Sequence, residues 1–324
     1  MGLAISFCTQ TFPPPPSFNP STDIPDLRGK VILITGGYSG IGEATVKELL
    51  KHNAKVYIAG RSLDKFEQCV TRLKPETRGR EPTFLQVNLG NLASVQRAAE
   101  EFLSKETELH VLFNHAGQML CPVGHVTDDG YDAQFGTNVL GHFFFTKLLL
   151  PALIAGAKSS PDGKARVVNT SSFAHYLGSL DFETFKDGQK RRKLHKARLS
   201  SQSKLGNVIF SNELARRYGP QGIVSTALNP GHIRTSWRNN IPAWQAASID
   251  LILHEPEYGA LTLLWAGTSP ETVNYNGNNK FFMPWARLGE AKAGADDEKL
   301  GEELWAWLED QIREISSGTI KAKL

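Results

Sequence analysis

The sequence predicts an α/β fold in which one parallel, doubly wound sheet of about seven strands has helices on both faces. Three observations indicate this fold: short apolar runs, longer amphipathic segments between them, and the absence of a linker within the series. Continuous apolar runs are typical of strands buried on both faces. Helical segments between such strands allow the strands to run parallel. We therefore expect residues 29–324 to form a single domain.

The expected strands follow one another from residue 30 onward. They are KVILIT (30–35), AKVYIA (54–59), TFLQV (83–87), HVLFN (110–114), ARVVNT (165–170), IVSTAL (223–228) and NKFFM (279–283). Near the C-terminus, Leu300, Leu304 and Leu308 recur at the spacing of one helical face. We expect this last helix to pack back onto the core.

Composition limits the class of protein. The chain has 324 residues, 40% of them hydrophobic, and can bury a large core. Its formal net charge of +3 is small and dispersed, so no nucleic acid is expected as a partner. Cys8, Cys69 and Cys121 are too few and too widely spaced for a disulfide framework or a metal site. Because no apolar run approaches the length of a membrane span, we expect a soluble protein of the cytoplasm.

Residues 1–28 are expected to form a proline-rich tail that either wraps onto the domain or extends from it. The start, MGLAISFC, fits an acylation pattern at Gly2, with Cys8 as an acceptor for a second lipid. Acylation would give weak membrane association, to which the basic run from Lys190 to Arg198 could add attraction for anionic lipid. Short patterns arise often by chance, and an unmodified tail is the favoured interpretation.

A glycine-rich segment, TGGYSGIGEATVKELL, follows the first expected strand and opens a helix. Its glycines let the backbone turn sharply and approach a pyrophosphate, whose charge the helix N-terminus stabilises. The strand before and the helix after it favour a phosphate site over a purely structural turn. The residues expected at the cofactor are Gly36, Tyr38, Ser39, Gly40, Ile41 and Gly42.

With this T-G-x-x-x-G-x-G motif, the chain from about residue 28 to about residue 285 resembles the short-chain dehydrogenase/reductase family. The resemblance implies a Rossmann-type sheet that binds a nicotinamide cofactor. Family members that use NAD(H) often end the second strand with an acidic residue, where this chain has Gly60 followed by Arg61. A guanidinium can grip a 2′-phosphate, so NADP(H) is favoured over NAD(H).

The resemblance implies further cofactor contacts after the other strands. NHAG at 114–117 resembles the family's N-N-A-G, with His115 interpreted as a hydrogen-bonded structural residue. VNLGN lies near the adenine, and NPGHIRTSW resembles the loop that covers the nicotinamide. The contacts implied by these segments are Asn88, Leu89, Asn114, Gly117, Pro230, Gly231, Ile233 and Thr235.

The resemblance also implies four catalytic positions. Asn138 matches an asparagine that holds a water of the proton relay, and Ser172 matches the hydroxyl that orients the substrate oxygen. Lys204 matches the lysine that holds the nicotinamide ribose and lowers the pKa of a tyrosine four residues earlier. In this chain that earlier position is Ser200.

Serine at position 200 removes the expected proton donor. A phenol titrates near pH 10 and a neighbouring ammonium lowers its pKa by about 1–3 units, whereas an aliphatic hydroxyl is far less acidic and shorter. Three interpretations stay open: slow catalysis through Ser200, a water and Lys204; rescue by another group, such as Tyr176 or His175; or a cofactor-binding protein without chemistry. A serine introduced deliberately in place of tyrosine is a fourth.

The segment between Ser172 and Ser200 is similar to the retinol dehydrogenase-like branch of the family. In residues 232–250, Trp237, Ile241, Pro242 and Trp244 favour an apolar ligand, with core packing as the alternative. The predicted function is NADP(H)-dependent interconversion of a lipophilic alcohol and its ketone or aldehyde. A catalytically weak NADP(H)-binding protein is the alternative, and a homodimer stays open.

Overall fold

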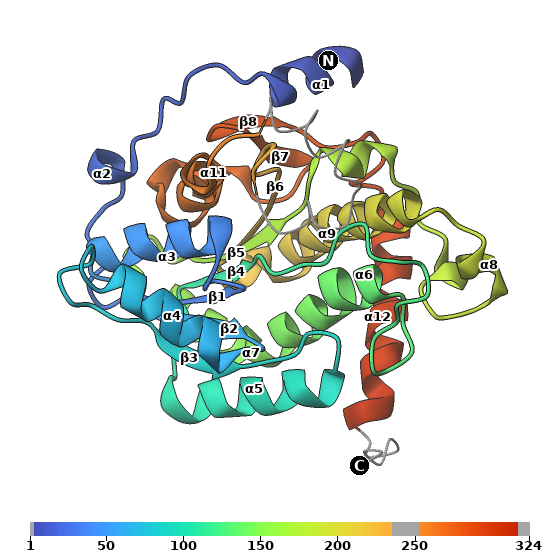
Figure 1. Ribbon diagram of the computed structural model, residues 1–324, viewed down its shortest axis with the longest axis horizontal. Helices are drawn as coiled ribbons and strands as arrows, with labels where there is room; N and C mark the ends of the chain where they lie inside the picture. The colour runs from blue at the N-terminus through green and yellow to red at the C-terminus, as the bar shows by residue number, and fades with distance from the viewer. Residues whose placement is uncertain (1–2, 235–252, 317–324) are drawn as a thin grey trace.

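An eight-stranded sheet runs through the middle of the protein in the order β3-β2-β1-β4-β5-β6-β7-β8 (Figure 1). The computed structural model describes residues 3–234 and 253–316. Seven strands are parallel, and β8 pairs antiparallel with β7. The strands are β1 (Val31–Thr35), β2 (Lys55–Gly60), β3 (Thr83–Gln86), β4 (Val111–Asn114), β5 (Ala165–Thr170), β6 (Ile223–Leu228), β7 (Lys280–Met283) and β8 (Arg287–Glu290).

The predicted parallel sheet with helices on both faces is confirmed. Each of the seven expected runs forms a strand, with bounds that shift by one or two residues at most. Only β8 was not expected, because RLGE is short, exposed at alternate residues and contains one large apolar side chain. It extends the sheet through a hairpin with β7, whose residues Lys280–Met283 pair with it in register.

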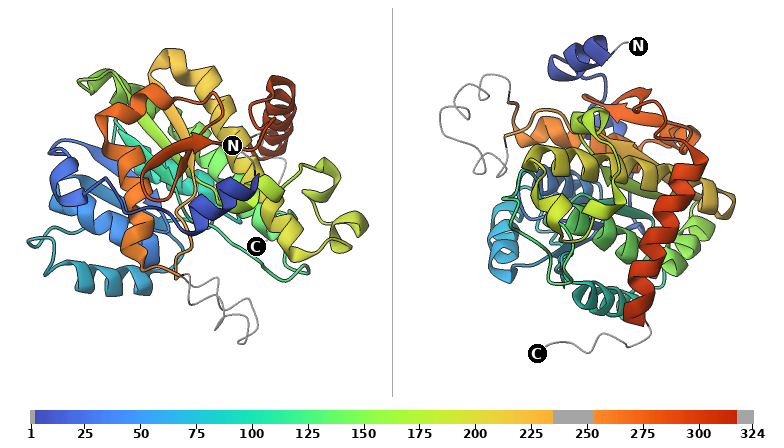
Figure 2. Two further views of the ribbon diagram at one scale, coloured as in Figure 1. Left: turned by 90° about the horizontal axis from the view of Figure 1, so that it is seen from above. Right: turned by 90° about the vertical axis from the view of Figure 1, so that its right-hand side faces the viewer.

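Helices cover both faces of the sheet (Figures 1 and 2). One core cluster joins the sheet to α5, α7, α9 and α12, and the other joins it to α3, α4 and α11. The longer helices are α3 (Gly40–Lys51), α4 (Leu63–Leu73), α5 (Leu92–Lys105), α7 (His142–Ser159), α9 (Lys196–Tyr218), α11 (Pro256–Thr268) and α12 (Glu298–Ser316). Short turns are α6 (Ala133–Phe135), α8 (Gln189–Arg192), the π-helix η1 (Gly136–Gly141), and the 3₁₀ turns η2 (Phe173–Leu177), η3 (Phe182–Thr184), η4 (Gly219–Gln221) and η7 (Pro270–Tyr275).

One helical stretch, Ala133–Ser159, has the length and apolar composition of a membrane span. The expectation that no such segment exists was therefore wrong at this place. Within the fold, 72% of its most apolar window is buried. A core helix buried by α5, α9 and the sheet needs this composition, because it faces apolar neighbours on most sides.

The N-terminal segment forms two short helices, α1 (Leu3–Thr11) and α2 (Pro20–Asp23). Phe18 and Leu27 are buried against the face that α3 and α11 cover, so this segment wraps onto the domain. Helix α1 lies beside β8, where the Arg287 guanidinium donates to the carbonyl of Thr9 at 2.8 Å (Figures 1 and 2). Gly2, the residue that fits the acylation pattern, lies outside the described residues.

Much of the basic run after residue 189 is neutralised within the fold. Arg191 is buried and pairs with Asp132 at 3.0 Å and with Asp187 at 2.8 Å. Lys190 pairs with Glu183 at 2.7 Å. These ion pairs reduce the positive charge that this segment presents to a partner.

The predicted packing of the C-terminal helix is confirmed, since Leu304, Trp305 and Leu308 of α12 are buried in the core. We expect Leu308→Ala to lower the free energy of unfolding by about 2–5 kcal/mol, because Leu308 has no exposed surface. Leu103→Ala, at a leucine of α5 that is 36% exposed, serves as the matched control and should cost less than about 1 kcal/mol. Urea denaturation measures both. Similar small losses for the two variants would show that α12 does not dock as described.

Candidate active site

A cavity of about 890 Å³ opens at the edge where the parallel strands end. Loops that follow six strands line it, because the carboxyl ends of parallel strands meet at one edge of a sheet. It is lined by thirteen of the residues expected at the cofactor and by Ser172. The thirteen are Gly36, Tyr38, Ser39, Gly40, Ile41, Arg61, Asn88, Leu89, Gly117, Lys204, Pro230, Gly231 and Ile233.

The glycine-rich turn has the shape of an anion cradle. Gly36 has φ +72°, and a Cβ there would lie 3.2 Å from Cα of Ala116. A Cβ on Gly42 would lie 2.4 Å from the carbonyl oxygen of Gly36, so glycine allows α3 to approach the turn. Ser39 precedes α3 without capping it, which leaves the first N–H groups of the helix for a ligand. These residues therefore fit the pyrophosphate of a dinucleotide.

Tyr38 and Gly60 pack together at the end of β2. A Cβ on Gly60 would lie only 2.2 Å from Cε1 of Tyr38, and the backbone N–H of Arg61 donates to the Tyr38 hydroxyl at 3.3 Å. The same wall carries two cations, Arg61 and Lys65. The sequence analysis missed Lys65, although its position four residues after Arg61, in the first turn of α4, was a usable signal.

The Thr35 hydroxyl fixes the loop after β4 to the end of β1. It accepts hydrogen bonds from the backbone N–H groups of His115 and Ala116, both at 2.9 Å. It also lies 2.8 Å from Nε2 of His142, whose other ring nitrogen bonds the carbonyl oxygen of Asn138. Burial lowers the pKa of His142 to about 4, so the ring is neutral, donates from Nδ1 and accepts the Thr35 proton at Nε2.

Asn138 lies in η1, a π-helix between α6 and α7 that widens the helix next to the cavity. Its Oδ1 accepts from the backbone N–H of Gln118 at 2.8 Å. Its amide nitrogen donates to the carbonyl of Gln118 and to the Ser203 hydroxyl, both at 2.9 Å. The whole amide is therefore engaged, and Asn138 braces the loop after β4 against α9 from behind the cavity wall.

Lys204 and Ser172 reach the cavity from neighbouring elements. The Lys204 ammonium donates to the carbonyl of Thr170 at 3.3 Å, and burial lowers its pKa to about 8. Ser172 accepts from the backbone N–H of Ala174 at 3.1 Å, which leaves its own hydroxyl proton for a ligand. His115 also lines this wall, 3.2 Å from the Thr170 hydroxyl, and burial lowers its pKa to about 3.

Ser200 is buried in the second turn of α9 and is absent from the residues that line the cavity. The two rescue candidates are engaged elsewhere. The Tyr176 hydroxyl donates to the carbonyl of Glu290 in β8. His175 accepts at Nε2 from the backbone N–H of Lys292 at 3.1 Å and donates from Nδ1 to the carbonyl of Ser172 at 2.7 Å. Burial lowers the pKa of His175 to about 4, which keeps this ring neutral.

The remaining predicted residues lie apart from the cavity or outside the description. Asn114 is buried and donates to Thr146 at 3.0 Å and to Asn169 at 2.9 Å, joining β4 to α7 and β5. Thr235 and the predicted substrate-loop residues Trp237, Ile241, Pro242 and Trp244 lie outside the described residues. Asn229 and His232, which flank Pro-Gly in the sequence, line the cavity and were not predicted.

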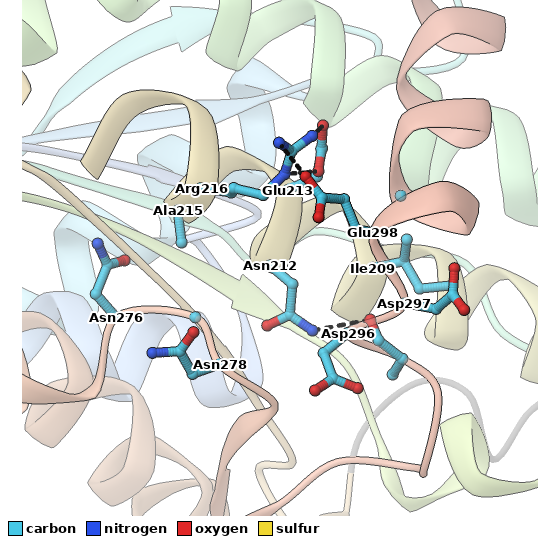
Figure 3. A pocket seen from close by; sticks show the side chains of 13 residues that line it. Ile209, Asn212, Glu213, Ala215, Arg216, Asn276, Asn278, Asp296, Asp297 and Glu298 are labelled. Carbon is cyan, nitrogen blue, oxygen red and sulfur yellow. Dashed lines mark hydrogen bonds and ion pairs between the residues drawn. The ribbon is translucent and has the colours of Figure 1, made fainter. Parts of the chain in front are cut away.

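A second pocket of about 320 Å³ lies between α9 and α12 (Figure 3). Ion pairs and hydrogen bonds cross it, including Arg216 to Glu298 at 2.8 Å and Asn212 to the carbonyl of Ala295 at 2.9 Å. Asn276, which lines this pocket, donates to the carbonyl of Ile223, the first residue of β6. The second pocket therefore lies at the edge of the sheet opposite to the large cavity. In the described part of the chain, no group of three or more His, Cys, Asp or Glu residues could hold a metal ion.

Known proteins with this fold and sequence define the class. The family model for short chain dehydrogenase matches residues 30–183. A short-chain dehydrogenase/reductase of Armillaria gallica is 53% identical over 97% of this chain and 100% of its own length. Retinol dehydrogenase 12 of Mus musculus is 35% identical over 86% of this chain and 85% of its own length. The chain belongs to the short-chain dehydrogenase/reductase family and is an oxidoreductase by this membership.

Solved structures show the same fold. A protein of Mycobacterium paratuberculosis has a TM-score of 0.71 and 28% identity, covering 90% of this chain and 96% of that one. A short chain dehydrogenase of Shigella flexneri, solved in complex with NADP, has a TM-score of 0.59 and 23% identity, covering 76% of this chain and 95% of that one.

The contact between Tyr38 and Gly60 predicts that substitutions at these two positions have non-additive effects on the free energy of unfolding. Gly60→Ala should lower the free energy of unfolding by about 1–3 kcal/mol, because the new methyl group overlaps the Tyr38 ring. In a Tyr38→Ala background the same change should cost less than about 1 kcal/mol. Denaturant unfolding of the four proteins measures both costs. Equal costs in the two backgrounds would contradict the contact.

Proposed function

We propose that the protein is an NADP(H)-dependent oxidoreductase that interconverts a lipophilic alcohol and its ketone or aldehyde. One observation carries the proposal: the cavity joins a cationic end, Arg61 and Lys65, through the glycine-rich turn to an end that holds Ser172 and Lys204. This arrangement suits a phosphorylated dinucleotide with its reactive ring at the second pair.

Different residues of this chain would hold different parts of the cofactor. The turn at 36–42 holds the pyrophosphate, and Arg61 with Lys65 grips a 2′-phosphate, since a guanidinium and an ammonium both favour a phosphate dianion. Lys204 would hold the nicotinamide ribose. When bound, the reduced nicotinamide supplies a hydride. The fold is shared with the NADP-bound Shigella flexneri protein.

At the reacting end, Ser172 orients the substrate oxygen. Its hydroxyl already accepts from Ala174 and so donates its own proton to a carbonyl. The Lys204 ammonium, with a pKa of about 8, stays charged at neutral pH and polarises the site. Asn138 holds the surrounding wall in place through Gln118 and Ser203.

Two kinds of observation favour a lipophilic substrate. Met119, Pro122 and Ile233 add apolar surface to the cavity wall. Two relatives, retinol dehydrogenase 12 of Mus musculus and retinol dehydrogenase 11 of Homo sapiens, are 35% and 32% identical to this chain. We extend their substrate class, an apolar alcohol and its carbonyl, to this protein.

A second candidate function follows from Ser200. Because its hydroxyl is buried away from the cavity, an oxidoreductase with serine at the tyrosine position would bind NADP(H) well and turn over slowly or not at all. Such a protein would act through its cofactor-bound state. The two candidates differ in turnover, which the second of the following experiments measures.

Removal of either cation should weaken NADPH binding selectively. For Arg61→Ala and Lys65→Ala, we expect the Kd for NADPH to rise about tenfold or more, because each change removes one charge-assisted contact of about 1.5–3 kcal/mol. The Kd for NADH should stay within about twofold. Lys74→Ala serves as a control, because Lys74 pairs with Glu81 beyond the same helix. Fluorescence titration measures all four proteins, and equal weakening of both nucleotides would contradict a 2′-phosphate site.

Restoring a phenol should accelerate the reaction. We expect Ser200→Tyr to raise kcat for apolar aldehydes or ketones by about tenfold or more, because a positioned acid contributes about 10²–10⁴ in rate. NADPH consumption is measured for both proteins after NADPH binding is verified. A loss of rate in Ser200→Ala would assign the serine a water-assisted role. Absence of turnover in both the parent and Ser200→Tyr would contradict the proposed function.

A further inference from the structure

The proposed reaction needs a group that reaches the cavity and exchanges a proton with the substrate oxygen. Ser200, Tyr176 and His175 do not line the cavity, and the two ring nitrogens of His175 are both engaged. Histidine exchanges protons near neutral pH more readily than any other side chain of ordinary pKa. Three histidines line the cavity: His115, His125 and His232.

Two of the three are poorly suited. Burial holds the pKa of His115 at about 3, and Nδ1 of this ring meets the Thr170 hydroxyl. His125 lies in the exposed loop where the backbone N–H of Asp128 donates to the carbonyl of Gly90, at the end of the cavity that follows β3. That end faces the adenosine side of the proposed cofactor. His232 is therefore the remaining candidate for proton exchange.

His232 lies on the loop next to the one that carries Ser172. Thr170 and Leu228 pair at the ends of β5 and β6, and Ser172 and His232 follow them at a distance of two and four residues. Neighbouring strands are about 4.8 Å apart, so the two loops leave the sheet side by side. Both side chains line the cavity.

Helix α1 connects the same two loops. Phe7 packs edge-on against Phe173, with ring centroids 5.1 Å apart, and the Thr11 hydroxyl lies 3.3 Å from Nε2 of His232. Residues four apart are separated by about 6 Å along a helix. Phe173 and the His232 ring therefore contact the same side of α1, about one helical turn apart.

Within the described residues, the His232 ring is held by a hydrogen bond at one of its two nitrogens. Thr11 is buried and bonds Nε2, whereas Nδ1 has no hydrogen-bond partner in residues 3–234 and 253–316. The loop itself is held by Gln10, whose buried amide oxygen accepts from Asn229 at 2.9 Å. Asn229 in turn accepts from the backbone N–H of Gly231 at 3.0 Å. Among the residues that the structure describes, this arrangement orients the imidazole through Nε2 and leaves Nδ1 for a ligand.

We propose that His232, oriented by Thr11 of helix α1, exchanges the substrate proton in place of the absent phenol; this inference rests on the proposed function. In reduction, the carbonyl carbon gains the hydride of the reduced nicotinamide. The carbonyl oxygen gains the proton from Nδ1 of the imidazolium, which becomes neutral and takes a new proton from water. In oxidation, the neutral ring accepts the hydroxyl proton while the hydride leaves the alcohol carbon for the oxidised nicotinamide.

Charged neighbours set the pH at which each direction operates. Burial, and then the nearby His254, lower the pKa of His232 below its ordinary value of 6.5. The other charged groups on adjoining segments are Arg234, paired with Glu255 at 3.2 Å, and Arg287, held by the carbonyl of Thr9. Reduction uses the protonated ring and so declines as pH rises through this lowered pKa. Oxidation uses the neutral ring and rises over the same range.

The test places His232→Gln in two backgrounds, the parent and Ser200→Tyr. Glutamine keeps a polar contact for Thr11 but carries no exchangeable acid. We expect kcat to fall about 10²-fold in the parent and less than about threefold in Ser200→Tyr, where the phenol supplies the proton. The Kd for NADPH should stay unchanged in both. His52→Gln at the end of α3 is the matched control, since this ring bonds the carbonyl of Glu48 far along the chain from the cavity.

A second pair of variants tests the hydrogen bond between the Thr11 hydroxyl and the His232 ring. Thr11→Val keeps the shape of the side chain and removes the hydroxyl, and we expect it to lower kcat only in the parent background, with Thr11→Ser restoring the rate. Ring NMR of the protein without cofactor gives the pKa of His232 directly. The pH at which kcat/KM of the parent changes must follow that value and shift with it in Thr11→Val, because kcat/KM reports the pKa values of the free enzyme.

Several results would overturn the role of His232. Equal losses of kcat in the two backgrounds would show that His232 only positions the loop. If His232→Gln left kcat of the parent unchanged, the proton path would run through Lys204 and water instead of His232. Turnover in Ser200→Tyr with none in the parent would show that no proton path exists beside the phenol, while leaving the proposed function intact. No turnover in either would overturn both.

Discussion

The cavity depends on one buried hydroxyl, that of Thr35 at the end of β1. It accepts two backbone N–H groups from the loop after β4 and donates to His142, which in turn donates to the carbonyl of Asn138. Every hydrogen-bonding position of this hydroxyl is used, and a buried partner left unpaired would cost about 1–3 kcal/mol. The glycine-rich turn begins at the next residue, so the phosphate cradle, the opposing loop and the π-helix are positioned relative to a single atom.

Periodicity and local motifs made most of the sheet predictable. The seven parallel strands are apolar enough to be identified from sequence, and the glycine-rich turn occupies the place its context indicates. The sequence could not reveal that Asn138 lies behind the cavity wall, because its three partners are set by the widened helix and by α9. It also could not reveal β8, which owes its strand conformation to β7 rather than to its own residues.

In the proposed site, the residues that would hold the cofactor line the cavity, whereas Ser200 does not. Lys204 and Ser172 are positioned by α9 and by the end of β5, which are joined by the bond from the Ser171 hydroxyl to the backbone carbonyl of Lys204. Ser200 belongs to the same rigid helix, and a rigid helix cannot bring a short side chain closer to the cavity. In the proposed reaction, side-chain reach thus decides which group exchanges the proton, while the backbone decides where a cofactor would lie.

Helix α1 contacts segments that are synthesised long after α1 itself. Gln10, Thr11 and Thr9 bond to Asn229, His232 and Arg287, across separations of 219, 221 and 278 residues. Helix α1 can therefore make these contacts only after the chain has been synthesised as far as Arg287. Until then the buried amide oxygen of Gln10 lacks the hydrogen bond from Asn229, the residue that follows β6, and this side of the cavity is incomplete. Segments that lie far apart in the sequence therefore complete this wall of the cavity together, and the wall can form only after both segments have been synthesised.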